Sequence, residues 1–350
     1  MPGSSKDKWQ AWPAESIDLS IDQLISQYEQ GFQGAIKDPE ADEMFDAMSE
    51  YKTFSDAADA FGLADSGKGK LSLPFLSTMK YYPLAFPGPA QTTGDCVSRA
   101  TATGTTVTIF VEVDLGIPDE ETGKVEGPPE LFHKDGNQGV IATEPIYGDR
   151  GHGGQGASCS KLAATVVRDG VLVRINYSDL GLDLSNYKAS IGASWGGRGV
   201  PANVIAEGRK HLIRHSTRIK TLEEARDALA NGYGLSCCSG LGFSSTRNED
   251  GVSPRKGSWS HGMGWSAVDD RDWAHKKYGG PLFLIQNSWA KWNSGPRTVY
   301  GTNFQIPEGA FWVTYKDALS ILNSDGSFAF SSANGWPRRE LPDYGSHMFP

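Results

Sequence analysis

The sequence predicts an α+β fold in which helices and antiparallel strands are segregated along the chain. The chain has 350 residues, of which 38% are hydrophobic and 21% are charged, so it can bury a substantial core. Helical periodicity comes first, and short apolar runs separated by turns rich in glycine, proline and asparagine follow later. This order favours segregation over repeated strand–helix–strand units.

Two helical patterns lie in the N-terminal part of the chain. Ser20 and Gln23 form a capping-box pattern that predicts the start of the first helix. Asp38 and Pro39 predict the start of the second helix, whose apolar stripe runs past a break to Phe61. Both apolar stripes predict packing against a core.

The charge distribution separates this part from the rest of the chain. Residues 1–65 contain 14 acidic and four basic residues, a net charge of −10, whereas the whole chain carries −9. We therefore expect an acidic helical N-terminal extension and linker at 1–69, a main domain at 70–330 and an irregular C-terminal tail at 331–350. The extension has three open roles: a pro-segment, a docking arm for a protein partner, or a stable part of the domain.

The main domain contains alternating helical and strand-like patterns. The expected helices lie near 96–112, 158–169 and 222–231, and the expected strands near 170–175, 232–238, 262–269, 282–287 and 311–315.

Several classes of function are disfavoured. The segment 62–69 nearly spells a phosphate-binding loop but lacks the final serine or threonine, and the G-x-G-x-x-G at 151–156 follows no convincing strand. We find neither a metal-binding motif nor a basic stripe, so we expect no cofactor, no metal and no nucleic-acid partner.

We see no membrane span and no secretory signal. The four cysteines do not suggest a disulfide framework, and a reducing compartment fits them better. The expected location is therefore cytoplasmic or virion-associated.

A set of residues in fixed order suggests nucleophilic catalysis by a thiol. A thiol reacts as the thiolate, which needs a nearby base, and the base needs a third group to orient it. Cys96 stands where a glycine-containing turn leads into a predicted helix, whose positive end is expected to lower the thiol pKa. Gln91 precedes it as a candidate amide donor, and His261 and Asn287 lie in strand-like runs.

The motifs Q-x-x-x-x-C, S-H-x-x-x-x-x-A-V and I-x-N-S-W in this order resemble the papain family of cysteine proteases. The resemblance covers roughly residues 80–330 and implies a two-lobed fold with a peptide-binding cleft between a helical and a β lobe. It implies that Cys96 is the nucleophile, that His261 is its base, that Asn287 orients the imidazole and that Gln91 donates to the oxyanion.

The resemblance also implies roles around these four residues. Trp289 would shield the bond between histidine and asparagine, and Gly153 and Gly154 would form one wall of the substrate cleft. His152 is a competing histidine, because this wall brings it near the site.

The sequence departs from the family pattern at three points. Gln91 lies five rather than six residues before the cysteine, and Val97 replaces the tryptophan that usually follows it. The disulfide between the nucleophile loop and the glycine-rich segment is missing, because Thr93 and His152 occupy those positions.

The main hypothesis is a cysteine peptidase that hydrolyses peptide bonds in a peptide or protein substrate. One alternative is a structural or interaction protein, in the extreme case a virion component, that keeps the fold with little or no activity. A further alternative is a hydrolase of cell-wall peptides.

Overall fold

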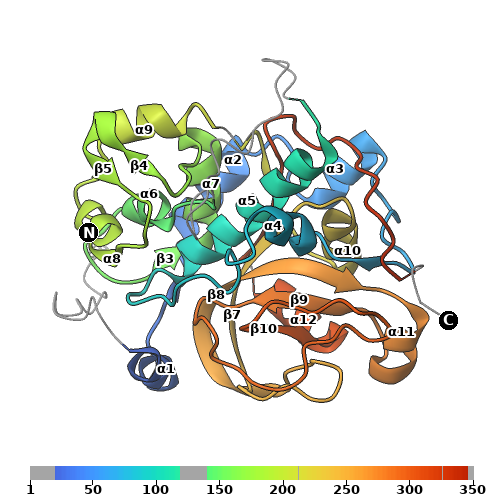
Figure 1. Ribbon diagram of the computed structural model, residues 1–350. Coiled ribbons are helices and arrows are strands. Elements are labelled where there is room, and N and C mark those ends of the chain that lie inside the picture. Colours follow the sequence, from blue (N-terminus) through green and yellow to red (C-terminus); the bar gives the residue numbers. More distant parts are fainter. Residues whose placement is uncertain (1–19, 119–139, 212, 325, 346–350) are drawn as a thin grey trace, which may run out of the picture.

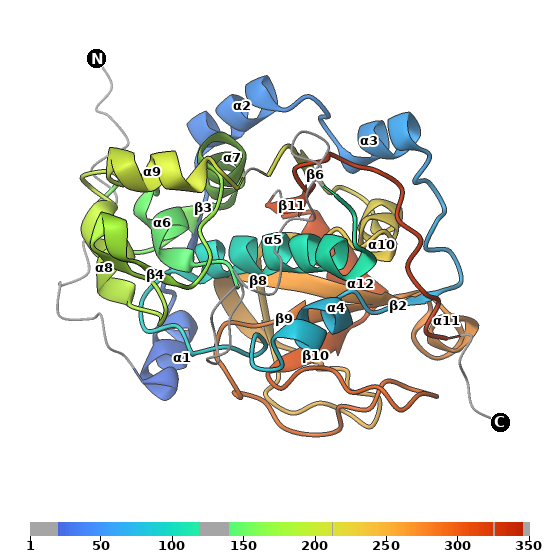
Figure 2. The same ribbon diagram turned by 45° about the horizontal axis from the view of Figure 1, so that its top comes forward.

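A group of helices and an antiparallel sheet lie side by side, and helix α5 (Cys96–Leu115) runs between them (Figure 1). Figure 2 shows this helix across the middle of the molecule. This arrangement confirms the predicted α+β fold, with a helical lobe, an antiparallel β lobe and a helical N-terminal extension. The computed structural model describes residues 20–118, 140–211, 213–324 and 326–345.

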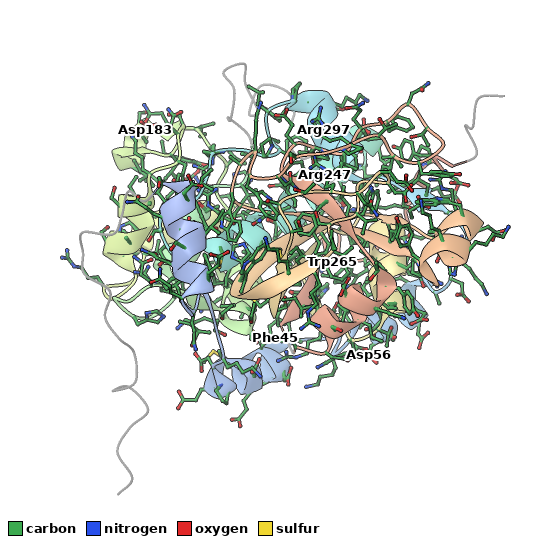
Figure 3. The ribbon with its side chains drawn as sticks, turned by 90° about the horizontal axis from the view of Figure 1, so that it is seen from below. Phe45, Asp56, Asp183, Arg247, Trp265 and Arg297 are labelled. Carbon is green, nitrogen blue, oxygen red and sulfur yellow. A yellow bond between two sulfur atoms is a disulfide. The ribbon has the colours of Figure 1, made fainter. Side chains whose placement is uncertain are left out.

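The β lobe is built on a seven-stranded sheet. Its strand order is β10-β9-β8-β7-β11-β6, with β2 pairing at one end of β8, and every pairing between these strands is antiparallel. Trp265 lies at its centre and is fully buried (Figure 3). The strands are β2 (Leu71–Ser72), β6 (Ser216–Arg218), β7 (Leu235–Phe243), β8 (Arg255–Asp269), β9 (Leu282–Gln286), β10 (Ala310–Val313) and β11 (Ser327–Phe330).

The other elements surround α5 and the sheet. The remaining helices of the main domain are α4 (Phe75–Tyr81), α6 (Thr143–Gly148), α7 (Cys159–Asp169), α8 (Ala189–Trp195), α9 (Ala202–Gly208), α10 (Leu222–Ala230), α11 (Asp272–Tyr278) and α12 (Tyr315–Leu322), with the short 3-10 helix Ser178–Leu180. Two small sheets pair β1 (Ala35–Ile36) with β3 (Ala157–Ser158), and β4 (Asn176–Tyr177) with β5 (Leu182–Asp183).

Most of the predicted elements of the main domain are present. The three predicted helices correspond to α5, α7 and α10, and four of the five predicted strands correspond to β7, β8, β9 and β10. The strand predicted at 170–175 is wrong. Val173 there forms an isolated antiparallel bridge with Ile141 and is not part of a strand.

The N-terminal helices begin where their capping residues predict. Helix α1 (Ile21–Glu29) starts after Ser20, and both hydrogen bonds of the capping box are formed. Helix α2 (Pro39–Met48) starts after Asp38, whose side chain accepts from the Ala41 amide at 3.1 Å. Helix α3 (Phe54–Phe61) follows the predicted break.

Helices α2 and α3 belong to the main core. Phe45 packs edge-on against Phe328 of the sheet, with ring centroids 4.7 Å apart, and Phe54 packs on Trp336 at 5.3 Å. All four side chains are buried. The linker is also held, because Asp227 accepts hydrogen bonds from the backbone amides of residues 65 and 67.

The C-terminal segment at 331–345 is irregular and packs into the molecule. Trp336 is fully buried, and Arg339 forms a buried ion pair of 2.8 Å with Glu112 of α5. Replacing only one residue of such a buried ion pair strongly destabilises the fold, because the remaining buried charge then lacks a partner.

The cysteines form one disulfide that we did not expect from the sequence. Cys159, the first residue of α7, is bonded to Cys238 of β7, with Cα atoms 6.4 Å apart. The two cysteines are 79 residues apart in sequence, which conceals their proximity. Because disulfides persist mainly in oxidising compartments, the cysteines no longer favour a reducing one.

Replacing Phe54 with alanine is expected to lower the free energy of unfolding by about 3–5 kcal/mol, because it leaves a cavity in the main core. The matched variant Phe61→Ala lies on the same helix with 38% of its side chain exposed, and should cost about 1 kcal/mol or less. Urea denaturation followed by circular dichroism gives both values. Equal small losses would show that α3 is not part of the core.

Candidate active site

The first turn of α5 meets strand β8 at the candidate nucleophile. Cys96 is the first residue of the helix, is fully buried, and its Sγ accepts a hydrogen bond of 3.3 Å from the Gly262 amide. Gly262 directly follows His261 on β8. A Cβ atom on Gly262 would lie 2.8 Å from the Val97 Cα, so the helix reaches the strand only because this residue is glycine.

The predicted base and its partner are hydrogen-bonded. His261 Nε2 and Asn287 Oδ1 are 2.8 Å apart, and both residues are buried. Among the described residues, His261 Nδ1 has no hydrogen-bond partner. The Trp289 ring lies 4.7 Å from the imidazole between ring centroids and is itself fully buried.

Gln91 is held against the residue that follows Asn287. Its backbone amide donates to the Ser288 carbonyl at 2.9 Å, and its side-chain oxygen accepts from the Ser288 hydroxyl. Its side-chain amide donates to the Thr93 carbonyl at 2.9 Å and to the Tyr28 hydroxyl at 3.4 Å. These contacts bring Cys96, His261, Asn287 and Gln91 into one region.

Gly153 and Gly154 lie on a bend rather than on a pairing edge. The Gly154 carbonyl accepts from the Arg150 side chain at 2.8 Å, and Gly153 is exposed. Strand pairing begins a few residues further along the chain, at β3, where residues 157 and 158 pair with β1. The neighbouring His152 is partly buried, which lowers its pKa to about 4.

Residues 28–36, which we call the strap, cross the site, and no sequence pattern indicated this. The Gly34 amide donates to the Ser260 carbonyl at 2.8 Å, and its carbonyl accepts from the Ala157 amide at 3.0 Å. The strap therefore bridges β8 and β3, and β1 at its end runs parallel to β3. A Cβ atom on Gly34 would lie 2.6 Å from Cys96 Sγ, so the backbone passes directly over the thiol.

Tyr28 fills the space in front of the thiol. Its hydroxyl is hydrogen-bonded to Cys96 and lies within reach of the Gln91 amide. Its ring packs edge-on against His261, with centroids 4.9 Å apart, and it is buried. A carbonyl oxygen receiving a bond from Gln91 would have to occupy the place of this hydroxyl. The helical stripe of α1 predicted that Tyr28 is buried but not where.

Burial favours the neutral forms of the Cys96 thiol and the His261 imidazole. It raises the pKa of the Cys96 thiol to about 11, although the bonds from Tyr28 and Gly262 act in the opposite direction. It also lowers the pKa of His261 to about 4, against the effect of the bond to Asn287. The expected depression of the thiol pKa is therefore wrong for this covered conformation, because removal from water outweighs the helix dipole.

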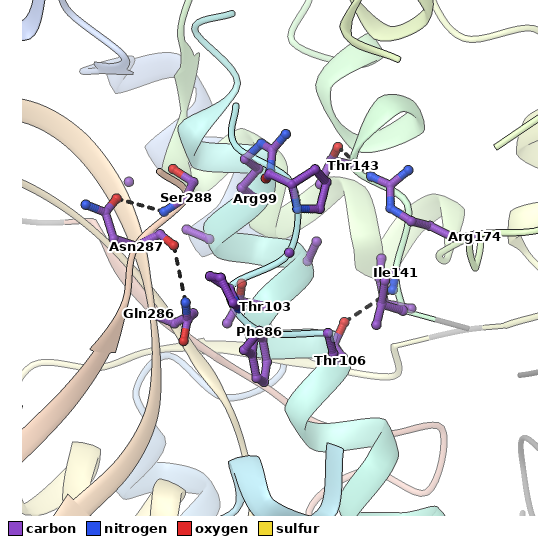
Figure 4. A pocket seen from close by; sticks show the side chains of 18 residues that line it. Phe86, Arg99, Thr103, Thr106, Ile141, Thr143, Arg174, Gln286, Asn287 and Ser288 are labelled. Carbon is purple, nitrogen blue, oxygen red and sulfur yellow. Dashed lines mark hydrogen bonds between the residues drawn. The ribbon is translucent and has the colours of Figure 1, made fainter. Parts of the chain in front are cut away.

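A cavity lies beside Asn287 and Ser288, along the face of α5 that carries Arg99 and Thr103 (Figure 4). Its empty volume is about 580 Å³, which includes space continuous with solvent, and neither Cys96 nor His261 lines it. Arg99 donates from this wall to the Pro89 carbonyl at 2.7 Å and pairs with Asp95. Residues 85–89, which precede Gln91 and Cys96 in the chain, also line this cavity.

In the described ranges, no three histidine, cysteine, aspartate or glutamate side chains gather to hold a metal ion. No helix there combines the length and apolarity needed to cross a membrane.

No protein-family model and no curated protein sequence match the chain. Among solved structures, procathepsin B S9 from Trypanosoma congolense is 9% identical, with a TM-score of 0.47, covering 93% of this chain and 92% of that one. The proform of the ragweed pollen cysteine protease Amb a 11 is 13% identical, with a TM-score of 0.45 and coverages of 93% and 80%. Xylellain, a cysteine protease from Xylella fastidiosa, is 13% identical, with a TM-score of 0.42 and coverages of 70% and 82%.

These matched structures are cysteine proteases. Because identities and TM-scores are low, we base the functional proposal on the geometry of the site.

In the intact chain, we expect Cys96 to react slowly with iodoacetamide at neutral pH. With a thiol pKa of about 11, only about one molecule in 10⁴ carries the thiolate at pH 7. The alkylation rate should therefore rise about tenfold per pH unit between pH 6 and 9 without a plateau. Mass spectrometry of the Cys96 peptide measures this rate. A plateau already at pH 6 would indicate a thiolate–imidazolium pair beneath the strap.

Proposed function

We propose that the chain is a cysteine peptidase that uses Cys96, His261 and Asn287, with Gln91 as the oxyanion donor. The observation that supports it best is the junction of α5 and β8. There a buried thiol at a helix N-terminus adjoins a histidine that is hydrogen-bonded to asparagine and sealed by tryptophan. Such a set supplies a nucleophile, a base and an orienting group in one place.

The reaction follows from these positions. His261 takes the proton of Cys96 while the sulfur forms a bond to the substrate carbonyl carbon, and the oxygen becomes an oxyanion that accepts from the Gln91 amide and the Cys96 backbone amide. His261 then gives its proton to the leaving amine as the peptide bond breaks. A water molecule, deprotonated by His261, cleaves the thioester and releases the acid.

The described conformation is a latent form in this proposal. A substrate carbonyl needs the space that Tyr28 fills, so the strap must leave before catalysis. Residues 38–69 need not move, because α2 and α3 pack on the core away from Cys96. The strap then acts as a pro-segment would, whereas residues 38–69 are a stable part of the domain.

The covered site also favours a second candidate, an interaction protein with little or no activity. In that case the strap stays in place, and residues 1–65 or the outer surface bind a protein partner. Cleavage of cell-wall peptides differs from the main proposal only in the substrate. Hydrolysis rates on a panel of peptides that includes cell-wall peptides distinguish the two.

Replacing Tyr28 with alanine is expected to raise the alkylation rate of Cys96 at pH 7 by at least about tenfold. The change admits water to Cys96, so the thiol pKa falls. The alkylation rate then reaches its plateau at a lower pH than in the intact chain. Tyr300→Ala, at a side chain that is 50% exposed, is the matched control and should leave the rate unchanged. A Tyr28 variant as slow as the intact chain would favour the inactive interaction protein.

In the chain opened by Tyr28→Ala, we expect hydrolysis of a fluorogenic peptide library. Adding Asn287→Ala should lower kcat by about 10²-fold, because the imidazole loses its orienting partner, whereas Cys96→Ala should lower it by about 10⁴-fold or more. Initial rates at saturating substrate measure both, with circular dichroism to confirm folding. Full activity of the Asn287 variant would contradict its assigned role.

A further inference from the structure

A short loop carries the oxyanion donor into the nucleophilic helix, and Gln155 contacts the middle of this loop. Gln155 Oε1 accepts from the Thr93 hydroxyl and from the Gly94 amide, each at 2.6 Å. The Gly156 amide adds a bond of 3.1 Å to the Gly94 carbonyl. Because a backbone amide only donates, the Gln155 atom that faces it must be the oxygen.

The Gly94 backbone is packed tightly against Gln155 and Gly156. A Cβ atom on Gly94 would lie 2.8 Å from Gln155 Oε1 and 2.9 Å from the Gly156 amide nitrogen. The hydroxyl of the buried Tyr147 also donates to this Gln155 oxygen at 3.2 Å, which further restricts the position of the oxygen. The loop is therefore pressed against the segment before β3.

A chain of hydrogen bonds continues from this contact to the oxyanion donor. Thr93, which binds Gln155 through its hydroxyl, accepts the Gln91 side-chain amide through its carbonyl at 2.9 Å. Other side chains hold the neighbouring parts of the loop. Arg99 binds the Pro89 carbonyl, and the Tyr187 hydroxyl lies 3.4 Å from the Thr92 amide. Gln155 binds the two donors in the middle of the loop, the Thr93 hydroxyl and the Gly94 amide.

We propose that Gln155 is a positioning residue that sets the place of the Gln91 amide relative to Cys96. This inference rests on the proposed peptidase function. Gln155 touches neither the thiol nor the substrate carbonyl, and it acts through Thr93 and Gly94. Without its oxygen, the two loop donors lose their acceptor, and the Gln91 amide is no longer held where the oxyanion forms.

The test uses the full chain opened by Tyr28→Ala and two kinds of reagent. A chromogenic peptide ester acylates Cys96 through an oxyanion, whereas iodoacetamide alkylates the thiolate without one. Gln155→Leu has a similar size but no acceptor, and Gln155→Glu keeps acceptor oxygens. Gln305→Leu, at an exposed position, is the matched control.

We expect Gln155→Leu to slow acylation by about 10- to 100-fold while alkylation and its pH profile change by less than about twofold. Gln155→Glu should recover most of the acylation rate, and Gln305→Leu should not differ from the parent. Thr93→Val, which removes only one of the two donors, should give a smaller loss and serves if Gln155→Leu does not fold.

Two results would overturn the inference. If acylation and alkylation fall together, Gln155 only stabilises the fold, and if neither falls, it does not position the donor. A parent chain that alkylates but never acylates would instead contradict the peptidase function itself, and with it this inference.

Discussion

The close approach of helix α5 to strand β8 is the contact on which the candidate site depends. A Cβ atom on Gly262 would meet the Val97 Cα at 2.8 Å, and one on Gly264 would meet the Thr103 Cβ at 2.6 Å. Glycine at both positions lets the strand backbone lie close against the helix, which places Cys96 beside His261. Gly264 also pairs with Gln286 across the sheet, so the same register brings Asn287 to the imidazole. A one-residue slip of β8 would turn His261 to the opposite face.

Burial beneath the strap then decides the charge state of the site. A thiol pKa of about 11 in place of 9.0 corresponds to a penalty of about 3 kcal/mol on the thiolate. A helix N-terminus typically favours a negative charge by about 0.3–1 kcal/mol, so the dipole of α5 cannot offset this penalty. Access to water therefore sets the charge state of the Cys96 thiol, and in the proposed peptidase Tyr28 limits this access.

Local signals were readable from the sequence, whereas long-range contacts were not. The caps at Ser20 and Asp38 and the start of α5 depend on residues within one turn, and each is confirmed. The order of cysteine, histidine and asparagine indicated the residues that meet, although their catalytic roles stay predictions. The strap and the Cys159–Cys238 disulfide depend on partners far along the chain, and neither leaves a local pattern. Tyr28 looked like any other member of an apolar stripe.

In the proposed peptidase, the strap is held by bonds that a peptide substrate can replace. The Ser260 carbonyl and the Ala157 amide, which bind Gly34, are backbone groups that any extended peptide can satisfy. Each such bond contributes only about 1 kcal/mol net, and exchanging strap for substrate leaves their number unchanged. The strap differs from a substrate in that it buries Tyr28. Burial of such a large side chain stabilises the bound strap by about 2–3 kcal/mol. By contrast, Phe45 and Phe54 fix the helices that follow, so the proposed opening of the site would end near Asp38 and leave the core intact.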